Sequence, residues 1–248
     1  MNSDLSPWLV VIPARLGSQR LPRKPLLQIN GRPLIRWVWD NLAPLAEAGA
    51  TLVVATDSEE VATVCNQEQI SVTLTRDDHP SGSDRCNEVA ARYALPFILN
   101  VQGDEPFVRC FDLFQLMAIL AASTDSEIAT LAYRSTNKAL ISNPNVVKIV
   151  TDCQRYARYF SRLPIPYWRD FPANANSNEH WLHLGVYAFR RESLENFCAL
   201  PVSPLEAAEK LEQLRALENN LRIIVVEASH FSCGIDTPED LARAEKIL

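Results

Sequence analysis

Short apolar runs alternate with polar loops and helical patterns along the first hundred residues of the chain. Residues 8–12 form a continuous, partly β-branched apolar run that stops at Pro13, which is typical of a strand buried on both faces. Similar runs at residues 52–56, 72–75 and 97–101 predict three further strands. Apolar positions at helical spacing predict helices that begin near Pro33 and that cover residues 59–67 and 84–93. This order predicts parallel β-α-β winding, with ligands bound at the carboxyl ends of the strands.

The pattern changes in the second half of the chain. Residues 128–134, 146–151 and 155–161 are strand-like without intervening helices, which predicts an antiparallel ribbon added to the parallel sheet. Residues 172–179 hold three Asn and nothing apolar larger than alanine, so they predict a mobile loop. Further strands are predicted at residues 183–190 and 222–227, and helices at residues 205–218 and 237–248. With no linker or internal repeat, we predict one α/β domain over residues 1–248, a mixed, mostly parallel sheet flanked by helices.

Composition and charge narrow the function classes. The 248 residues are 47% apolar and 22% charged, as in ordinary globular domains, which excludes disorder and coiled coil. The net charge of −6 argues against a general nucleic-acid binder. No apolar run approaches the roughly 18 residues of a membrane span, so we expect a cytoplasmic protein with no membrane partner. The six cysteines are scattered without a C-x-x-C pair, so reduced thiols are expected in place of a zinc or redox site.

The glycine motifs of common nucleotide-binding folds are missing from the chain. It contains no G-x-G-x-x-G and no Gly-Lys pair, which argues against a dinucleotide oxidoreductase and a P-loop NTPase. The stretch V-I-P-A-R-L-G-S-Q-R-L-P-R-K-P-L, residues 11–26, instead places four cations in the loop after the first strand. Guanidinium groups and backbone amides neutralise and orient phosphate oxygens, so this loop predicts a triphosphate site, with a solvated basic loop as the alternative. The residues are Arg15, Arg20, Arg23 and Lys24, with Gly17 and Ser18 allowing close backbone approach.

Two acidic residues and one polar segment are further candidates. Asp104 follows a predicted strand in Q-G-D-E-P, where a carboxylate suits a Mg²⁺ ion that bridges phosphates, although an Asx turn before Pro106 explains it equally well. Asp236 precedes the last predicted helix, where it could equally support the helix N-terminus. Residues 81–85, S-G-S-D-R, open a predicted helix and could hold a nucleoside or act only as a helix cap.

Nine further segments, taken together with residues 11–26, resemble the sugar-acid cytidylyltransferases and in particular the 3-deoxy-manno-octulosonate (Kdo) cytidylyltransferase family. The resemblance spans nearly the whole chain, and the set is specific although each segment alone would be weak. Arg23 departs from it, because the family usually has glycine before the lysine. The segments are A-T-D-S-E-E-V (55–61), T-R-D-D-H-P-S-G-S-D-R (75–85), N-V-Q-G-D-E-P (100–106), N-P-N-V-V-K (143–148), Y-F-S-R (159–162), H-L-G-V-Y (183–187), S-P-L-E (203–206), E-Q-L-R (212–215) and G-I-D-T-P-E-D-L (234–241).

The resemblance implies a Rossmann-like nucleotidyltransferase fold and transfer of CMP from CTP to the anomeric hydroxyl of Kdo for lipopolysaccharide biosynthesis, with release of pyrophosphate. It implies Mg²⁺ held by Asp104 and Asp236, and a homodimer. Lys24, Arg15 and the two aspartates would be catalytic. CTP would be bound by Ala14, Arg15, Gly17, Ser18, Arg20, Lys24, Ser81 and Gly82, and the sugar acid by Gln102, Arg162, His183, Tyr187, Glu206 and Gln213.

Two alternatives stay open at this point. One is activation of a related sugar acid, such as amino-Kdo or sialic acid, although H-L-G-V-Y and E-Q-L-R resemble the Kdo branch. The other is a non-catalytic nucleotide-sugar sensor, against which the presence of both Asp104 and Asp236 argues.

Overall fold

The structure, a computed structural model, describes residues 4–17, 21–169, 179–232 and 234–248. The chain divides into two compact units, one made of Met1–Phe114 with Ser232–Leu248 and the other of Gln115–Phe231. The boundary falls inside helix α4 (Cys110–Ala122). The predicted mobile loop at residues 172–179 lies almost wholly outside the described residues.

The first unit is built on four parallel strands in the order β6-β1-β4-β5. These are β1 (Trp8–Pro13), β4 (Thr51–Thr56), β5 (Val72–Leu74) and β6 (Phe97–Asn100). All six residues of β1 are buried, as its continuous apolar run predicted. The parallel winding expected for this half of the sequence is therefore confirmed.

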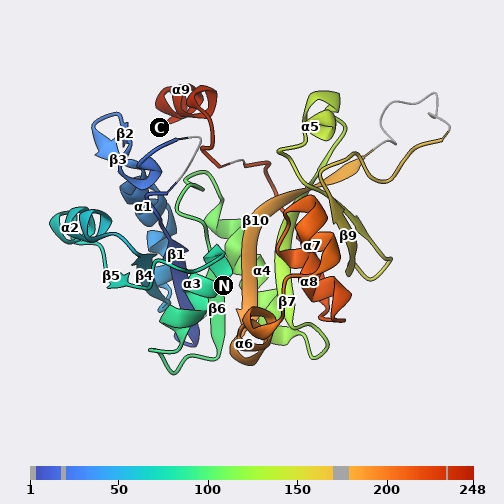
Figure 1. Cartoon of the computed structure of the whole chain (residues 1–248), viewed down its shortest axis with the longest axis horizontal. Coiled ribbons are helices and arrows are strands. Elements are labelled where there is room, and N and C mark those ends of the chain that lie inside the picture. Colours follow the sequence, from blue (N-terminus) through green and yellow to red (C-terminus); the bar gives the residue numbers. More distant parts are fainter. Residues whose placement is uncertain (1–3, 18–20, 170–178, 233) are drawn as a thin grey trace. The chain divides into compact units, whose positions relative to one another are not determined.

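The helices of this unit connect its strands, except the last, which follows the second unit in the chain. They are η1 (Lys24–Leu26), α1 (Leu34–Glu47), α2 (Glu59–Gln67), α3 (Gly82–Ala90) and α9 (Pro238–Ile247), and a small hairpin joins β2 (Gln28–Ile29) to β3 (Arg32–Pro33). Pro33 is the N-cap of α1 and not its first residue, a small correction. Helix α9, red in Figure 1, contacts the blue β2 hairpin, where Asn30 Nδ2 donates to the Glu245 carbonyl at 3.1 Å. The C-terminal segment is thus anchored to the N-terminal part of the first unit.

The second unit holds a mixed sheet. Strand β7 (Ile128–Ser135) pairs parallel with β11 (Ile223–Glu227) and antiparallel with β10 (His180–Arg190). The antiparallel pair β8 (Lys148–Thr151) and β9 (Ala157–Ser161) joins at β10, which confirms the predicted ribbon. A five-residue helix, α5 (Lys138–Ser142), lies between β7 and β8, so the expectation of no intervening helix was wrong.

The remaining helices of the second unit are α6 (Arg191–Ala199), α7 (Pro204–Glu209) and α8 (Gln213–Glu218). The single helix predicted at residues 205–218 is wrong, because Lys210 adopts a left-handed conformation with φ 55° and ends α7. None of the helices in the described part of the chain is long and apolar enough to cross a membrane.

Candidate active site

A cavity of about 620 Å³ opens where β1 and β6 end in the first unit. Its walls come from the loop after β1, the segment after β6 and the segment before α9. Most of the lining residues are those predicted above for CTP, sugar or metal, whereas Ser18 and Arg20 lie outside the described residues. The cavity is lined by Pro13, Ala14, Arg15, Gly17, Lys24, Pro25, Gln102, Gly103, Asp104 and Asp236.

Gly103 allows the ends of β1 and β6 to meet at this cavity. Its N–H donates to the Pro13 carbonyl at 3.1 Å. A Cβ at this position would lie 2.9 Å from that carbonyl oxygen and 3.3 Å from Ala14 Cβ, both too close for a side chain. Glycine is therefore required here, and it brings Asp104 next to the loop that follows β1.

Lys24 binds both predicted metal ligands. Its Nζ donates to Asp104 Oδ2 at 2.6 Å and to Asp236 Oδ1 at 2.7 Å, although 212 positions separate Lys24 from Asp236. Burial by itself lowers the pKa of Lys24, but the two carboxylates outweigh it and raise the pKa above its ordinary value. Lys24 is thus a permanent cation on the cavity wall.

Two backbone contacts fix the distance between the aspartates. Ile235 N–H donates to the Asp104 carbonyl at 2.9 Å, and Gly234 N–H donates to the Glu105 carboxyl group. Burial, followed by repulsion from Asp104 and Asp236, raises the pKa of Glu105 to about 8. Glu105 was not among the predicted site residues, and its only signal in the sequence is its place beside Asp104 in Q-G-D-E-P.

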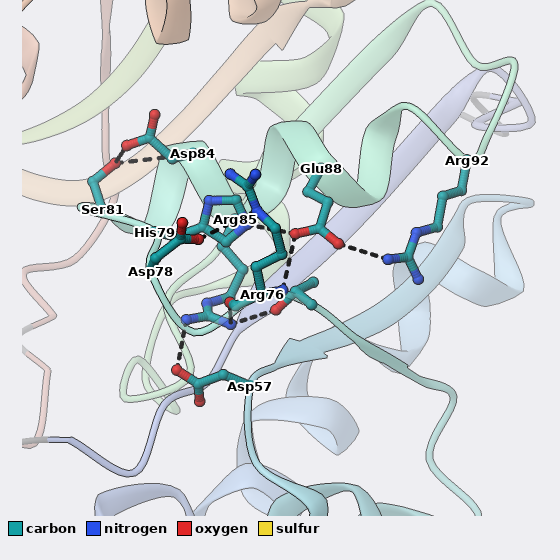
Figure 2. A network of polar contacts seen from close by, with 10 residues as sticks. Asp57, Arg76, Asp78, His79, Ser81, Asp84, Arg85, Glu88 and Arg92 are labelled. Carbon is teal, nitrogen blue, oxygen red and sulfur yellow. Dashed lines mark hydrogen bonds and ion pairs between the residues drawn. The ribbon is translucent and has the colours of Figure 1, made fainter.

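The N-terminus of α3 lies against the cavity residue Gln102. A Cβ on Gly82 would lie 3.0 Å from the Gln102 side-chain amide, so a side chain here would displace the end of Gln102. The Ser81 hydroxyl caps α3 by accepting from Asp84 N–H at 3.2 Å, and it donates to Asp84 Oδ2 at 2.6 Å (Figure 2). Because the cap uses the hydroxyl, the predicted contact of Ser81 with a nucleotide would use its backbone or replace this cap.

Two side chains of α3 hold the loop that precedes it. Arg85 donates to Asp57 Oδ2 at 2.8 Å and to the Arg76 carbonyl at 3.1 Å. Glu88 accepts from Arg76 N–H at 3.0 Å and contacts His79 Nε2 at 2.5 Å, as Figure 2 shows. Arg85 is almost fully buried, so the final arginine of the T-R-D-D-H-P-S-G-S-D-R segment anchors the loop to the end of β4.

The second unit holds five of the other predicted residues, and three of them, His183, Tyr187 and Gln213, are buried or have aromatic neighbours. His183 and Tyr187 lie on β10 with ring centroids 5.3 Å apart, and Phe160 of β9 meets His183 edge-on at 5.3 Å. Burial lowers the pKa of His183 to about 3 and, with the Glu212 charge, raises that of Tyr187. Gln213 is buried at the start of α8. His183 and Tyr187 are therefore uncharged near pH 7, in a partly aromatic region that also feels the Glu212 charge.

Arg162, in contrast, is bound to backbone carbonyls. Its Nε donates to the Glu209 carbonyl at 2.8 Å, and its other nitrogens reach the Pro144 and Lys210 carbonyls at 3.1 and 3.3 Å. Lys148, fully buried, donates to the Val146 carbonyl at 2.6 Å and also to the Arg162 carbonyl. These contacts connect β8 and β9 to the end of α7.

Glu206 forms a buried ion pair. Arg215 Nε donates to its Oε2 at 2.6 Å, and the same carboxylate completes a capping box with Ser203 at the start of α7. All of the contacts described for Glu206 are thus structural. The predicted sugar-acid residues are therefore distributed between the units, with Gln102 in the first and the others in the second.

Comparison with known proteins shows the family to which the chain belongs. A cytidylyltransferase family model matches residues 9–223. The chain is 45% identical to 3-deoxy-manno-octulosonate cytidylyltransferase from Polynucleobacter necessarius subsp. necessarius (strain STIR1), over 100% of this chain and 99% of that protein. The protein of the same name from Koribacter versatilis (strain Ellin345) is also 45% identical, over 97% of this chain and 89% of that protein. A solved structure of CMP:2-keto-3-deoxy-manno-octonic acid synthetase complexed with CTP matches with a TM-score of 0.88 and 38% identity, covering 97% of each chain. The expected nucleotidyltransferase fold is thereby confirmed, and the chain belongs to the 3-deoxy-manno-octulosonate cytidylyltransferase family.

Proposed function

We propose that this protein transfers CMP from CTP to the anomeric hydroxyl of Kdo, giving CMP-Kdo and pyrophosphate for lipopolysaccharide biosynthesis. The observation that carries the proposal is the cluster of Lys24, Asp104 and Asp236 on the wall of a cavity that is also lined by the basic loop after β1. The names of the relatives and the CTP complex of the related synthetase support the same reaction.

The reaction needs positioning and charge neutralisation more than covalent chemistry. The anomeric oxygen forms a bond to the α-phosphorus as the bond from that phosphorus to the pyrophosphate oxygen breaks. Arg15 and Lys24, which both line the cavity, would orient the triphosphate and neutralise the charge that develops on the departing pyrophosphate. Gly17 and Ala14 leave room for the phosphates to approach the backbone.

The carboxylates fit a magnesium ion. Asp104 and Asp236 supply hard oxygen donors on the cavity wall. No group of three or more His, Cys, Asp or Glu side chains in the described residues could hold a metal, which suits an ion that takes one or two carboxylates and completes its shell with phosphates and water. When bound, Mg²⁺ would polarise a phosphate oxygen and orient the substrates.

Pyrophosphate release from CTP and Kdo tests the proposal, with CMP-Kdo identified by mass spectrometry. We expect release only when both substrates and Mg²⁺ are present. Turnover with sialic acid or amino-Kdo in place of Kdo would identify the related-substrate alternative, and nucleotide binding without turnover would identify the sensor. We expect cytidine to be selected by the small polar segment at residues 81–83, so equal turnover with ATP or GTP would contradict that part.

A cytoplasmic location and a homodimer are further parts of the proposal. Both are supported by the family resemblance alone. Sedimentation at micromolar concentration tests the dimer, and finding only monomer would count against it.

A further inference from the structure

The ring of His183 is held by a hydroxyl group on the neighbouring strand. Thr130 Oγ1 of β7 lies 2.9 Å from His183 Nε2 and 2.8 Å from the Val186 carbonyl oxygen of β10. The pairing of β10 with β7 is irregular between Leu184 and Tyr187, where a β-bulge leaves Gly185 and Val186 outside the register. The bulge lets the Val186 carbonyl bond to a side chain in place of the ladder.

The hydrogens at these three atoms can be assigned by counting. A threonine hydroxyl has one hydrogen, and a carbonyl oxygen can only accept, so the contact with Val186 uses the hydrogen of Thr130. The hydroxyl oxygen must then accept from His183, which places a hydrogen on Nε2. Because burial disfavours the charged imidazolium, the ring is neutral near pH 7 and its Nδ1 carries a lone pair. In the part of the chain that the structure describes, no protein group bonds to Nδ1.

We propose that Thr130 is a positioning residue that fixes His183 as the tautomer protonated on Nε2, so that Nδ1 accepts a hydrogen bond from a hydroxyl group of the sugar. The choice of ligand group follows from the lone pair, since an ionised carboxylate has no hydrogen to donate to it. His183 therefore binds a hydroxyl group of the sugar in preference to its carboxylate, which other residues bind. The sugar part rests on the proposed function, whereas the tautomer does not.

Nuclear magnetic resonance of the full-length protein with ¹⁵N-labelled histidine tests the tautomer directly. The chain has four histidines, and the signals of His183 are assigned by their loss in His183→Gln. We expect the ¹⁵N shifts of a neutral ring protonated on Nε2 at pH 7. A ring protonated on Nδ1, or on both nitrogens, would overturn the proposal without any activity measurement.

Two variants of Thr130 test the positioning role. Thr130→Val keeps the shape and removes the hydroxyl, and we expect mixed tautomers and a KM for Kdo raised roughly threefold to tenfold, the value of one oriented hydrogen bond. The KM for CTP should not change, and kcat should change less than the KM for Kdo. Thr130→Ser keeps the hydroxyl and should restore both the tautomer and the KM to within about twofold.

The outcomes separate this inference from the proposed function. Failure of the wild-type protein to use Kdo, with the Nε2 tautomer intact, would contradict the proposed function and the sugar contact but not the role of Thr130 in setting the tautomer. An unchanged tautomer or an unchanged KM for Kdo in Thr130→Val would overturn the positioning role. If Thr130→Val does not fold, the wild-type spectrum and the Thr130→Ser kinetics still decide the matter.

Discussion

The two units use charged residues in opposite ways. In the first unit, Lys24 and two aspartates converge on the wall of an open cavity. In the second, Glu206 and Arg215 pair within the protein and the nitrogens of Arg162 bond to backbone carbonyls, while His183 is a neutral ring with aromatic neighbours. The difference teaches that a charged residue in a family motif can belong to the framework as well as to the chemistry.

The largest expected effect is on stability and concerns the Glu206–Arg215 pair. Arg215→Met would leave a buried carboxylate without its partner, and we expect the free energy of unfolding to fall by about 3–5 kcal/mol. Denaturant unfolding measures this. Arg158→Met, which removes an exposed partner of Asp152, is the control and should change little. A stable Arg215→Met variant that lost only Kdo binding would break the comparison, because the pair would then belong to the site.

The next largest effect is on turnover. Asp104→Asn and Asp236→Asn each remove one unit of ligand charge at nearly constant size, and we expect kcat at saturating Mg²⁺ to fall on the order of 10²-fold, or about 2.7 kcal/mol. Each asparagine can still accept from Lys24, so the melting temperature should hold. The exposed Asp125→Asn should behave as wild type. The reverse result, normal turnover with a lower melting temperature, would give that aspartate a structural role only.

Lowering the pH also distinguishes the two units, because Glu105 of the first unit and His183 of the second change the stability of the protein in opposite directions. The pKa of Glu105 is raised to about 8, so the folded state holds the proton more tightly than the unfolded state, and stability rises as the pH falls from about 8 toward 4.5. The pKa of His183 is lowered to about 3, so the unfolded state binds the proton first, and stability falls as the pH drops below about 6.5.

Denaturant unfolding at several pH values separates the two contributions. Glu105→Gln should remove the first slope and His183→Gln the second, each slope being at most about 1.4 kcal/mol per pH unit. His230→Gln, at an exposed position, is the matched control. A slope that survives in its variant would assign the titration to another group.

The smallest effect is expected at Arg23. This residue adopts a left-handed conformation with φ 59°, which explains why glycine suits the position in the family. Its exposed side chain pairs with Glu60. In Arg23→Gly, the relief of left-handed backbone strain stabilises the protein, whereas the loss of the ion pair and the more flexible unfolded chain destabilise it. Because these contributions roughly balance, the free energy of unfolding should change by less than about 0.5 kcal/mol. Glu60→Gln removes the pair alone. A raised KM for CTP in Arg23→Gly only would instead indicate a phosphate contact.

Buried apolar runs and turn motifs made the first unit predictable from sequence. The run at β1 and the glycine beside Asp104 place the basic loop after β1 and one carboxylate without knowledge of the fold. The break between α7 and α8 could not be predicted, because residues 205–218 contain no glycine or proline and favour one helix. The Arg162 side chain, distant in sequence, bonds to the Glu209 and Lys210 carbonyls at that break.

The positioning role of Thr130 also could not be predicted from the sequence. Thr130 is one polar position in an apolar strand, and its role depends on a bulge in the neighbouring strand.

Helix α4 was missed for a different reason, since its long apolar run lacks a clear helical period.

The divided first unit has a consequence for how the protein is made. A ribosome synthesises Lys24 and Asp104 early, then the whole second unit, and only afterwards residues 232–248, which carry Asp236 and helix α9. A nascent or truncated chain that lacks this last segment holds the lysine with a single carboxylate and without the Ile235 and Gly234 backbone contacts. Chains that stop before residue 232 therefore cannot assemble the proposed metal site, and the first unit is completed only after the whole second unit has been synthesised.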